Sequence, residues 1–408
     1  MRISRQKSPR GDLGLCDKVS TDKDRDDDRD ERTMAVASAT TTTTTTRPRR
    51  VVPTRTVSSR RARAVTMKTT RDGADDSAAA GNLRDGSAHA AYVRDAANGK
   101  APAELEALVR VLEARGCELV RPNARRGLHP LVMPLAATTT RGEGGEDEEE
   151  VYGLMMTEES GGESVMPVVR VRGGVHAALV GKSASEFVHR AIVEEEARSD
   201  EERTTVAAAA GAVGVSLHNH GAFTTSGKEF DVYVTTHIGK FPSSMEGLVK
   251  RHLDRGDEQS ALITCDLYKS TFGEWGAPHV FISDLYGKLG RDEEARDAAR
   301  LALQTPWSTI GGSEAIERMI RVAGWQGKNV AEIKEVLESR RGPSAAAFDG
   351  PKSEKQLARE ESELLLDQLA AGEIEAATVN QRLAECYMNA GKPTLAKFIM
   401  CGSMPTSA

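Results

Sequence analysis

Residues 166–183 read MPVVRVRGGVHAALVGKS and contain a complete β-hairpin pattern followed by the start of a helix. Apolar residues alternate or cluster in 166–172 and in 175–180, as they do in half-buried strands. Gly173 and Gly174 lie between these runs and allow the backbone of a tight turn. Ser183 then stands three residues before Glu186, which is the capping-box pattern that begins a helix. We expect a hairpin that leads directly into a helix.

The neighbouring segments extend this pattern into an α+β domain over residues 102–198. Residues 103–115 predict an amphipathic helix that ends at Gly116, and 117–120 and 151–156 predict further strands. The apolar run 128–135 contains Pro130 and Pro134, and proline confines such a run to a sheet edge or an irregular crossing. The acidic stretch 141–150 is interpreted as a solvated hairpin loop. The expected domain is a small, largely antiparallel sheet with flanking helices.

From residue 199 onward the pattern is helical, with 199–230 as a connecting helical segment. Residues 231–401 predict an irregular tetratricopeptide-like domain of α-hairpins. Three places share a plan of helix, tight glycine turn and helix, and their glycines are Gly256, Gly290 and Gly391. Gly256 and Gly290 lie 34 residues apart, which is the period of tetratricopeptide hairpins. The predicted fold class is therefore α+β, with the sheet domain followed by the α-hairpin domain.

The N-terminal segment resembles a targeting sequence. Residues 34–71 contain no Asp or Glu and are rich in Arg, Ser and Thr, which is typical of an organelle transit peptide. The abundance of Thr and Ser favours the chloroplast over the mitochondrion, and we expect cleavage between Arg63 and Met67. The mixed charges upstream indicate that Met34 is the true start, so 1–67 comprises an upstream extension and a transit peptide. Residues 68–101, rich in Ala, Gly, Asp and Ser, predict a flexible linker.

Removal of the leader makes the chain strongly acidic. Residues 1–67 hold 16 of the 55 basic and 9 of the 61 acidic residues, so the rest carries 39 basic and 52 acidic residues, a net charge of −13. Such a charge repels phosphate backbones, and we expect no nucleic-acid partner. No apolar stretch approaches the ~20 residues of a membrane span, so we expect no stable membrane insertion.

Candidate chemistry is sparse in this sequence. Its five cysteines are isolated and lack the paired spacing of zinc sites, so we expect free thiols in a reducing compartment. His218 and His220 are the most metal-like pair, but no third ligand follows at a useful spacing. Gly181-Lys182-Ser183 resembles the end of a phosphate-binding loop, yet His176 stands where that loop needs glycine. We expect no catalytic residue, metal or cofactor, and keep as an alternative an enzyme with a site near Lys182 or His218.

Three large aromatic residues are the candidates for partner binding. Phe272, Trp275 and Trp307 lie in Gly-rich or Pro-containing turns of a chain whose aromatic content is only 4%. Rings in such positions are either core anchors between hairpins or hot spots of an interface, and the core role is the commoner one. We predict that at least some of them contact a partner protein.

Several stretches together resemble the plant and algal family In Chloroplast ATPase Biogenesis, assembly factors of the chloroplast ATP synthase. The resemblance spans about Glu104 to Ile399, while residues 312–360 depart from the family pattern. The stretches that carry it are 108–135 (with 127–128 and 134–135), 166–169, 186–190, 193–195, 221–223, 231–234, 241–242, 276–311, 384–387 and 390–391.

The resemblance implies a non-catalytic factor or chaperone of the chloroplast stroma that acts on the soluble catalytic head of the ATP synthase. It implies the gamma subunit as partner, joined with alpha and beta, and it carries over no catalytic or ligand residue. A tetratricopeptide-like adaptor for another chloroplast complex is the alternative, and only the identity of the partner separates the two.

Overall fold

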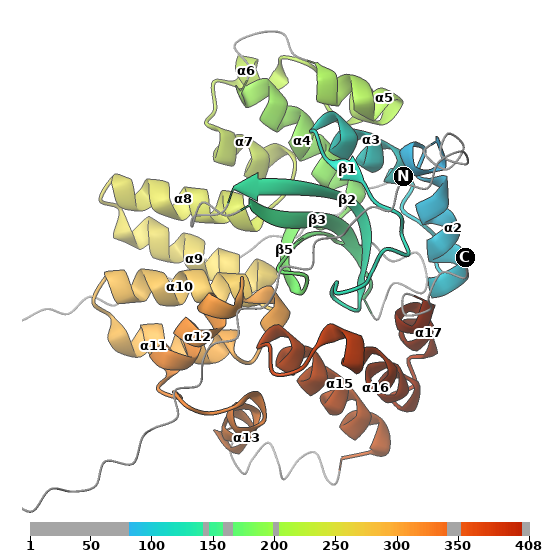
Figure 1. Ribbon diagram of the computed structural model, residues 1–408. Coiled ribbons are helices and arrows are strands. Elements are labelled where there is room, and N and C mark those ends of the chain that lie inside the picture. The colour runs from blue at the N-terminus through green and yellow to red at the C-terminus, as the bar shows by residue number, and fades with distance from the viewer. Residues whose placement is uncertain (1–80, 142–146, 158–165, 199–203, 341–351, 402–408) are drawn as a thin grey trace, which may run out of the picture. The chain divides into compact units, whose positions relative to one another are not determined.

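The computed structural model of this protein describes residues 81–141, 147–157, 166–198, 204–340 and 352–401 (Figure 1). The predicted transit peptide, the start at Met34 and residues 142–146 of the acidic stretch lie outside these ranges. The interpretation of 141–150 as a solvated loop is wrong for its second half, because Asp147–Glu150 begin a strand and Glu150 is 1% exposed, paired with Arg170 and Arg172.

A five-stranded antiparallel sheet forms the first part of the described chain, with the strands paired in sequence order. Gly173 and Gly174 connect the last two strands with φ angles of 55° and 79°, as the hairpin pattern predicts. The α+β fold class is thereby confirmed. The strands are β1 (Glu118–Leu119), β2 (Val132–Arg141), β3 (Asp147–Met155), β4 (Val168–Arg172) and β5 (His176–Gly181).

Pro134 lies inside β2, which pairs with both β1 and β3 and is therefore not the edge strand. The register of β2 against β3 shifts between Pro134 and Ala136, so the proline occupies an irregular position, as expected. Strand β1 pairs only with Ala136 and Ala137 and does not extend to Pro134. The missing N–H of the proline therefore breaks no regular ladder on that side.

Helices α3 (Leu105–Ala114), α4 (Ala184–Arg198) and α5 (Thr205–Leu217) share one apolar core with the sheet. Leu105, Leu108 and Leu112, at helical spacing on α3, are at most 3% exposed, which confirms the predicted amphipathic helix. Helix α5 packs against both α3 and α4. The core of the α+β domain therefore continues beyond residue 198 into the segment that we expected to be a connection.

The flexible-linker interpretation of residues 68–101 is wrong for its second half. Helix α2 spans Ser87–Ala97, and its Val93, Ala96 and Ala97 are at most 2% exposed. Alanine is common in linkers but is also the strongest helix former. The element that contacts α2 most extensively is α17 (Pro393–Cys401), at the other end of the described chain, which local sequence patterns cannot reveal (Figure 1).

The remainder is helical, and the three glycine-turn hairpins are present. Gly256, Gly290 and Gly391 have φ angles of 73°, 71° and 78° and join α8 to α9, α10 to α11 and α16 to α17. A tetratricopeptide-like stacking of these hairpins stays a prediction. The remaining elements are α6 (Ala222–Ser226), α7 (Phe230–His237), α8 (Pro242–Asp254), α9 (Glu258–Phe272), α10 (Gly276–Lys288), α11 (Asp292–Ala302), η1 (Trp307–Thr309), α12 (Ser313–Ala323), α13 (Val330–Arg340), α15 (Glu354–Ala370) and α16 (Ala376–Asn389).

Candidate functional site

Phe272 and Trp275 lie together where the helical hairpins meet the sheet. Phe272, the last residue of α9, is 3% exposed and packs in a cluster with Leu179 of β5 and Tyr268. Trp275 directly precedes α10 and is half-buried, because it packs against this cluster and against the valines of the sheet. Both rings therefore join the sheet to the hairpins, and Trp275 keeps part of its surface accessible.

Trp307 lies at a different junction and is completely buried. Its indole Nε1 donates to the carbonyl of Leu303 at 2.9 Å, and its backbone N–H donates to the carboxylate of Asp367 on α15 at 2.7 Å. Burial raises the pKa of Asp367, while an ion pair with Lys334 at 2.5 Å opposes that shift. In this conformation the rings of Phe272 and Trp307 offer no surface to a partner, and partner binding by the three aromatic residues stays a prediction.

Lys182 and Ser183 form a helix cap. The hydroxyl of Ser183 accepts from the backbone N–H of Glu186 at 3.1 Å, which confirms the predicted cap. The Glu186 carboxylate accepts in return from the backbone N–H of Lys182 at 3.0 Å, one residue earlier than in the standard capping box. The Lys182 ammonium lies 4.6 Å from the centre of the Phe272 ring. These residues thus stabilise the helix start and the junction beside it.

His218 is engaged in a buried polar contact. Its Nε2 lies 2.6 Å from the carboxylate of Glu196, which also accepts from the backbone N–H and the hydroxyl of Thr224. Burial opposes ionisation of Glu196, but the hydrogen bonds from Thr224 and His218 outweigh it and lower the pKa of Glu196. Burial, assisted by the nearby imidazoles of His218 and His237, lowers the pKa of His189 to about 4. This arrangement holds α4 to the segment around α6.

No group of three or more His, Cys, Asp or Glu side chains that could hold a metal ion occurs in the described ranges. Cys117, Cys265, Cys386 and Cys401 are free thiols, as expected, and burial raises the pKa of Cys265 to about 11. No helix in the described part of the chain is both long enough and apolar enough to cross a membrane.

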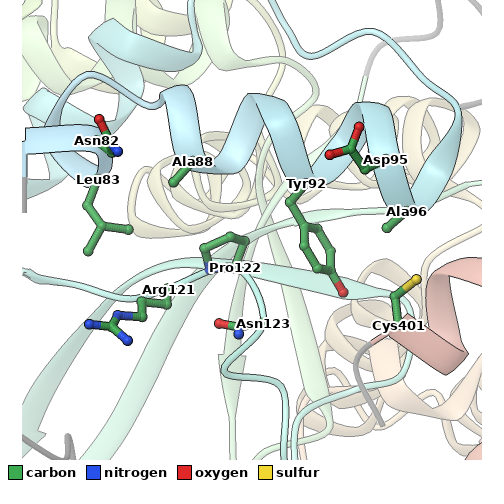
Figure 2. A pocket seen from close by; sticks show the side chains of 10 residues that line it. All are labelled: Asn82, Leu83, Ala88, Tyr92, Asp95, Ala96, Arg121, Pro122, Asn123 and Cys401. Atoms are coloured by element: carbon green, nitrogen blue, oxygen red, sulfur yellow. The ribbon is translucent and has the colours of Figure 1, made fainter. Parts of the chain in front are cut away.

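Two surface hollows were not predicted from the sequence. Figure 2 shows a hollow of about 460 Å³ between α2 and residues 121–123, where Tyr92 reaches toward Cys401. A second hollow of about 600 Å³ lies between α16 and α17, lined by the buried Ala384 and Ala396 and by Met388 and Met400. These methionines are 56% and 42% exposed. Methionine adapts its shape to different apolar partners, so this groove is a candidate interaction surface.

The only signal for the α16–α17 groove in the sequence is weak. Met388 follows Gln381 and Glu385 along the outer side of α16, where a polar residue is the ordinary choice. A single exposed apolar residue is common on protein surfaces and needs no explanation. Only the placement of Met400 beside it makes the pair notable.

Comparison with known proteins places these elements in a family. Three family models, described as the PAB N-terminal, PAB middle and PAB C-terminal domains, match residues 87–237, 242–326 and 331–401. The first begins at the first residue of α2, and the other two divide the helical region that we predicted as one domain. No solved structure matches the chain.

A curated relative matches most of the chain. It is Protein IN CHLOROPLAST ATPASE BIOGENESIS, chloroplastic, of Arabidopsis thaliana, which is 34% identical over 318 residues. The match covers 77% of this chain and 91% of the relative. With its domains matched in order and a relative of this identity over nearly its whole length, the chain belongs to the PAB family.

Proposed function

We propose that this protein is a non-catalytic assembly factor of the chloroplast ATP synthase and acts in the chloroplast stroma. The observation that carries the proposal is the match to 91% of a relative whose name states chloroplast ATPase biogenesis. All three PAB domains are matched, so the likeness does not depend on one widespread module.

The partner in this proposal is the gamma subunit, which the protein helps to join with alpha and beta. The net charge of −13 outside the leader favours basic partner surfaces and keeps the protein soluble. Two features provide apolar contact area: the groove with Met388 and Met400, and the accessible part of Trp275. A groove of this kind suits an amphipathic helix, whose apolar side chains would pack between α16 and α17.

The candidate catalytic groups contact other residues of the protein itself, and this supports a binding role. The Lys182 ammonium contacts the Phe272 ring, and His218 is paired with Glu196. A general base needs access to a substrate within hydrogen-bond reach, and the buried His218 lacks it because Glu196 occupies its Nε2.

The test is a pull-down from chloroplast stroma with the full mature chain carrying a C-terminal tag, read by mass spectrometry. We expect enrichment of gamma together with alpha and beta. The double variant M388K/M400K should lose at least about 90% of the captured gamma, because two charges cannot be buried against an apolar helix face. V215K is the matched control, since Val215 is 76% exposed on α5, and should capture as much as the unchanged protein.

Three results would each contradict one part of this proposal. Enrichment of a different chloroplast complex, with ATP synthase subunits at background, would replace the assembly factor by the adaptor alternative. Equal loss in V215K and in the double variant would show that added charge alone matters and would remove the groove from the proposal. If the Trp275→Phe variant captured no gamma and kept the melting temperature of the unchanged protein, the contact would instead lie at Trp275.

A further inference from the structure

Arg125 is a buried cation whose charge is compensated by uncharged groups. It lies in the connection between β1 and β2 and is 6% exposed. In the described structure its guanidinium donates to four oxygens. These are the carbonyls of Val132 (3.0 Å), Pro130 and Phe398 (2.6 Å) and the hydroxyl of Tyr92 (3.1 Å). A buried charge is tolerated only where such dipoles replace the lost water.

Phe398 meets this guanidinium in two ways. Its carbonyl accepts the 2.6 Å hydrogen bond from Nη1, and its ring lies 3.8 Å from the guanidinium carbon. Phe398 belongs to the last turn of α17, where the final four carbonyls have no acceptor role within the helix and carry a partial negative charge. Arg125 therefore caps the C-terminal end of α17 from a loop that lies more than 250 residues earlier in the chain.

Tyr92 completes the arrangement from α2. Its hydroxyl accepts from Arg125, and its ring packs edge-to-face on the Phe398 ring with 5.9 Å between centroids. One guanidinium thus joins α2, the β1–β2 connection and α17, which belong to the matched N-terminal and C-terminal domains. A second polar contact between these parts, from Lys397 Nζ to Asn98 Oδ1 at 3.1 Å, is exposed and contributes little.

We propose that Arg125 is a latch that fastens the C-terminal hairpin, α16 and α17, onto the N-terminal domain, and that this hairpin opens as a unit when the latch is broken. Arginine stays charged throughout the neutral pH range, so closure of the latch does not depend on pH. Opening exposes the apolar sides of α2 and α17, including Val93 and Phe398, which are 0% exposed when the latch is closed. The inference concerns the fold and holds whichever partner the protein binds.

Hydrogen exchange of the full mature chain, followed by mass spectrometry, tests the latch. Exchange in native conditions reports the opening of each segment separately. Arg125→Met keeps much of the apolar stem but leaves buried oxygens without donors. It should accelerate exchange in α16 and α17 at least about tenfold while α3, β3 and α10 keep their rates. Arg126→Met is the control, because Arg126 is the exposed neighbour, and should change none of these rates.

A milder variant keeps the test decisive if Arg125→Met does not fold. Tyr92→Phe removes one acceptor of the guanidinium and preserves the ring contact with Phe398, so we expect a several-fold acceleration confined to α2, α16 and α17. Unchanged exchange in α17 in the folded variants would overturn the latch. So would an equal acceleration across all elements, because that would make Arg125 a contributor to global stability only.

Discussion

Two glycines three residues apart at the α10–α11 turn should respond to the same substitution in opposite directions. Gly287 lies inside α10 with an ordinary helical backbone, whereas Gly290 lies in the turn with φ 71°. A methyl group on either residue would meet no heavy atom within 4 Å. The change to alanine therefore tests backbone conformation without a steric contribution.

The magnitudes follow from these conformations. Alanine in the left-handed region destabilises the fold by about 1–2 kcal/mol. The alanine variant also has a less flexible unfolded chain, which offsets about 0.4–1 kcal/mol of this cost, so Gly290→Ala should lower the free energy of unfolding by about 1 kcal/mol. In a helix interior alanine is about 0.5–1 kcal/mol better than glycine, so Gly287→Ala should gain about that amount. The two variants should differ by about 1.5–2 kcal/mol.

Thermal unfolding followed by circular dichroism at 222 nm measures the difference. At roughly 1.5 °C per kcal/mol for a chain of this size, the melting temperatures should lie about 2–3 °C apart, with the unchanged protein between them. Gly256→Ala, at the equivalent turn with φ 73°, should behave like Gly290→Ala. Shifts of the same sign for Gly287→Ala and Gly290→Ala would refute the turn conformation and with it the hairpin.

Three further predictions concern the interior. Burial lowers the pKa of His129 to about 4, so below pH 6.5 the unfolded chain binds a proton that the fold excludes. This group alone should lower the stability by about 1.4 kcal/mol per pH unit toward pH 4, and urea titrations of His129→Asn should show a profile that is flatter by that amount; an equally steep profile would contradict the assignment. Trp307→Ala should cost about 3–5 kcal/mol in urea unfolding and Trp275→Ala roughly half as much, since only the first ring is fully buried; equal costs would contradict this. A methyl group on Gly276 would lie 2.6 Å from Cγ1 of Ile310, so Gly276→Ala should cost about 1–3 kcal/mol, and an unchanged melting temperature would count against the packing there.

Features that depend on a few neighbouring residues were predictable. The Ser183 cap, the Gly173–Gly174 hairpin and the turn at Gly290 each follow from local geometry, because only a few residue types satisfy the backbone requirement well. The amphipathic pattern of α3 was equally clear, since its buried side chains recur at helical spacing. Such signals predict elements, their ends and the fold class.

The candidate interaction surfaces were harder to predict from the sequence. Phe272 and Trp307 are large aromatic residues of the kind found in interface hot spots, yet the structure places both rings in the interior, at two different junctions. Buried anchors and exposed hot spots use the same residue types, because both need large apolar area. The α16–α17 groove gave almost no signal, since its exposed methionines become a surface only when the two helices are paired.

The sequence by itself determined that this chain folds into antiparallel strands followed by helical hairpins, and where each hairpin turns, because those properties depend on backbone preferences within a few residues. Only the tertiary structure decided that residues 87–97 are a buried helix and that Arg125 caps α17. Both depend on contacts between residues far apart in the chain. Burial of α2 and of a guanidinium is favourable only once those distant partners have excluded water, and no local pattern contains that information.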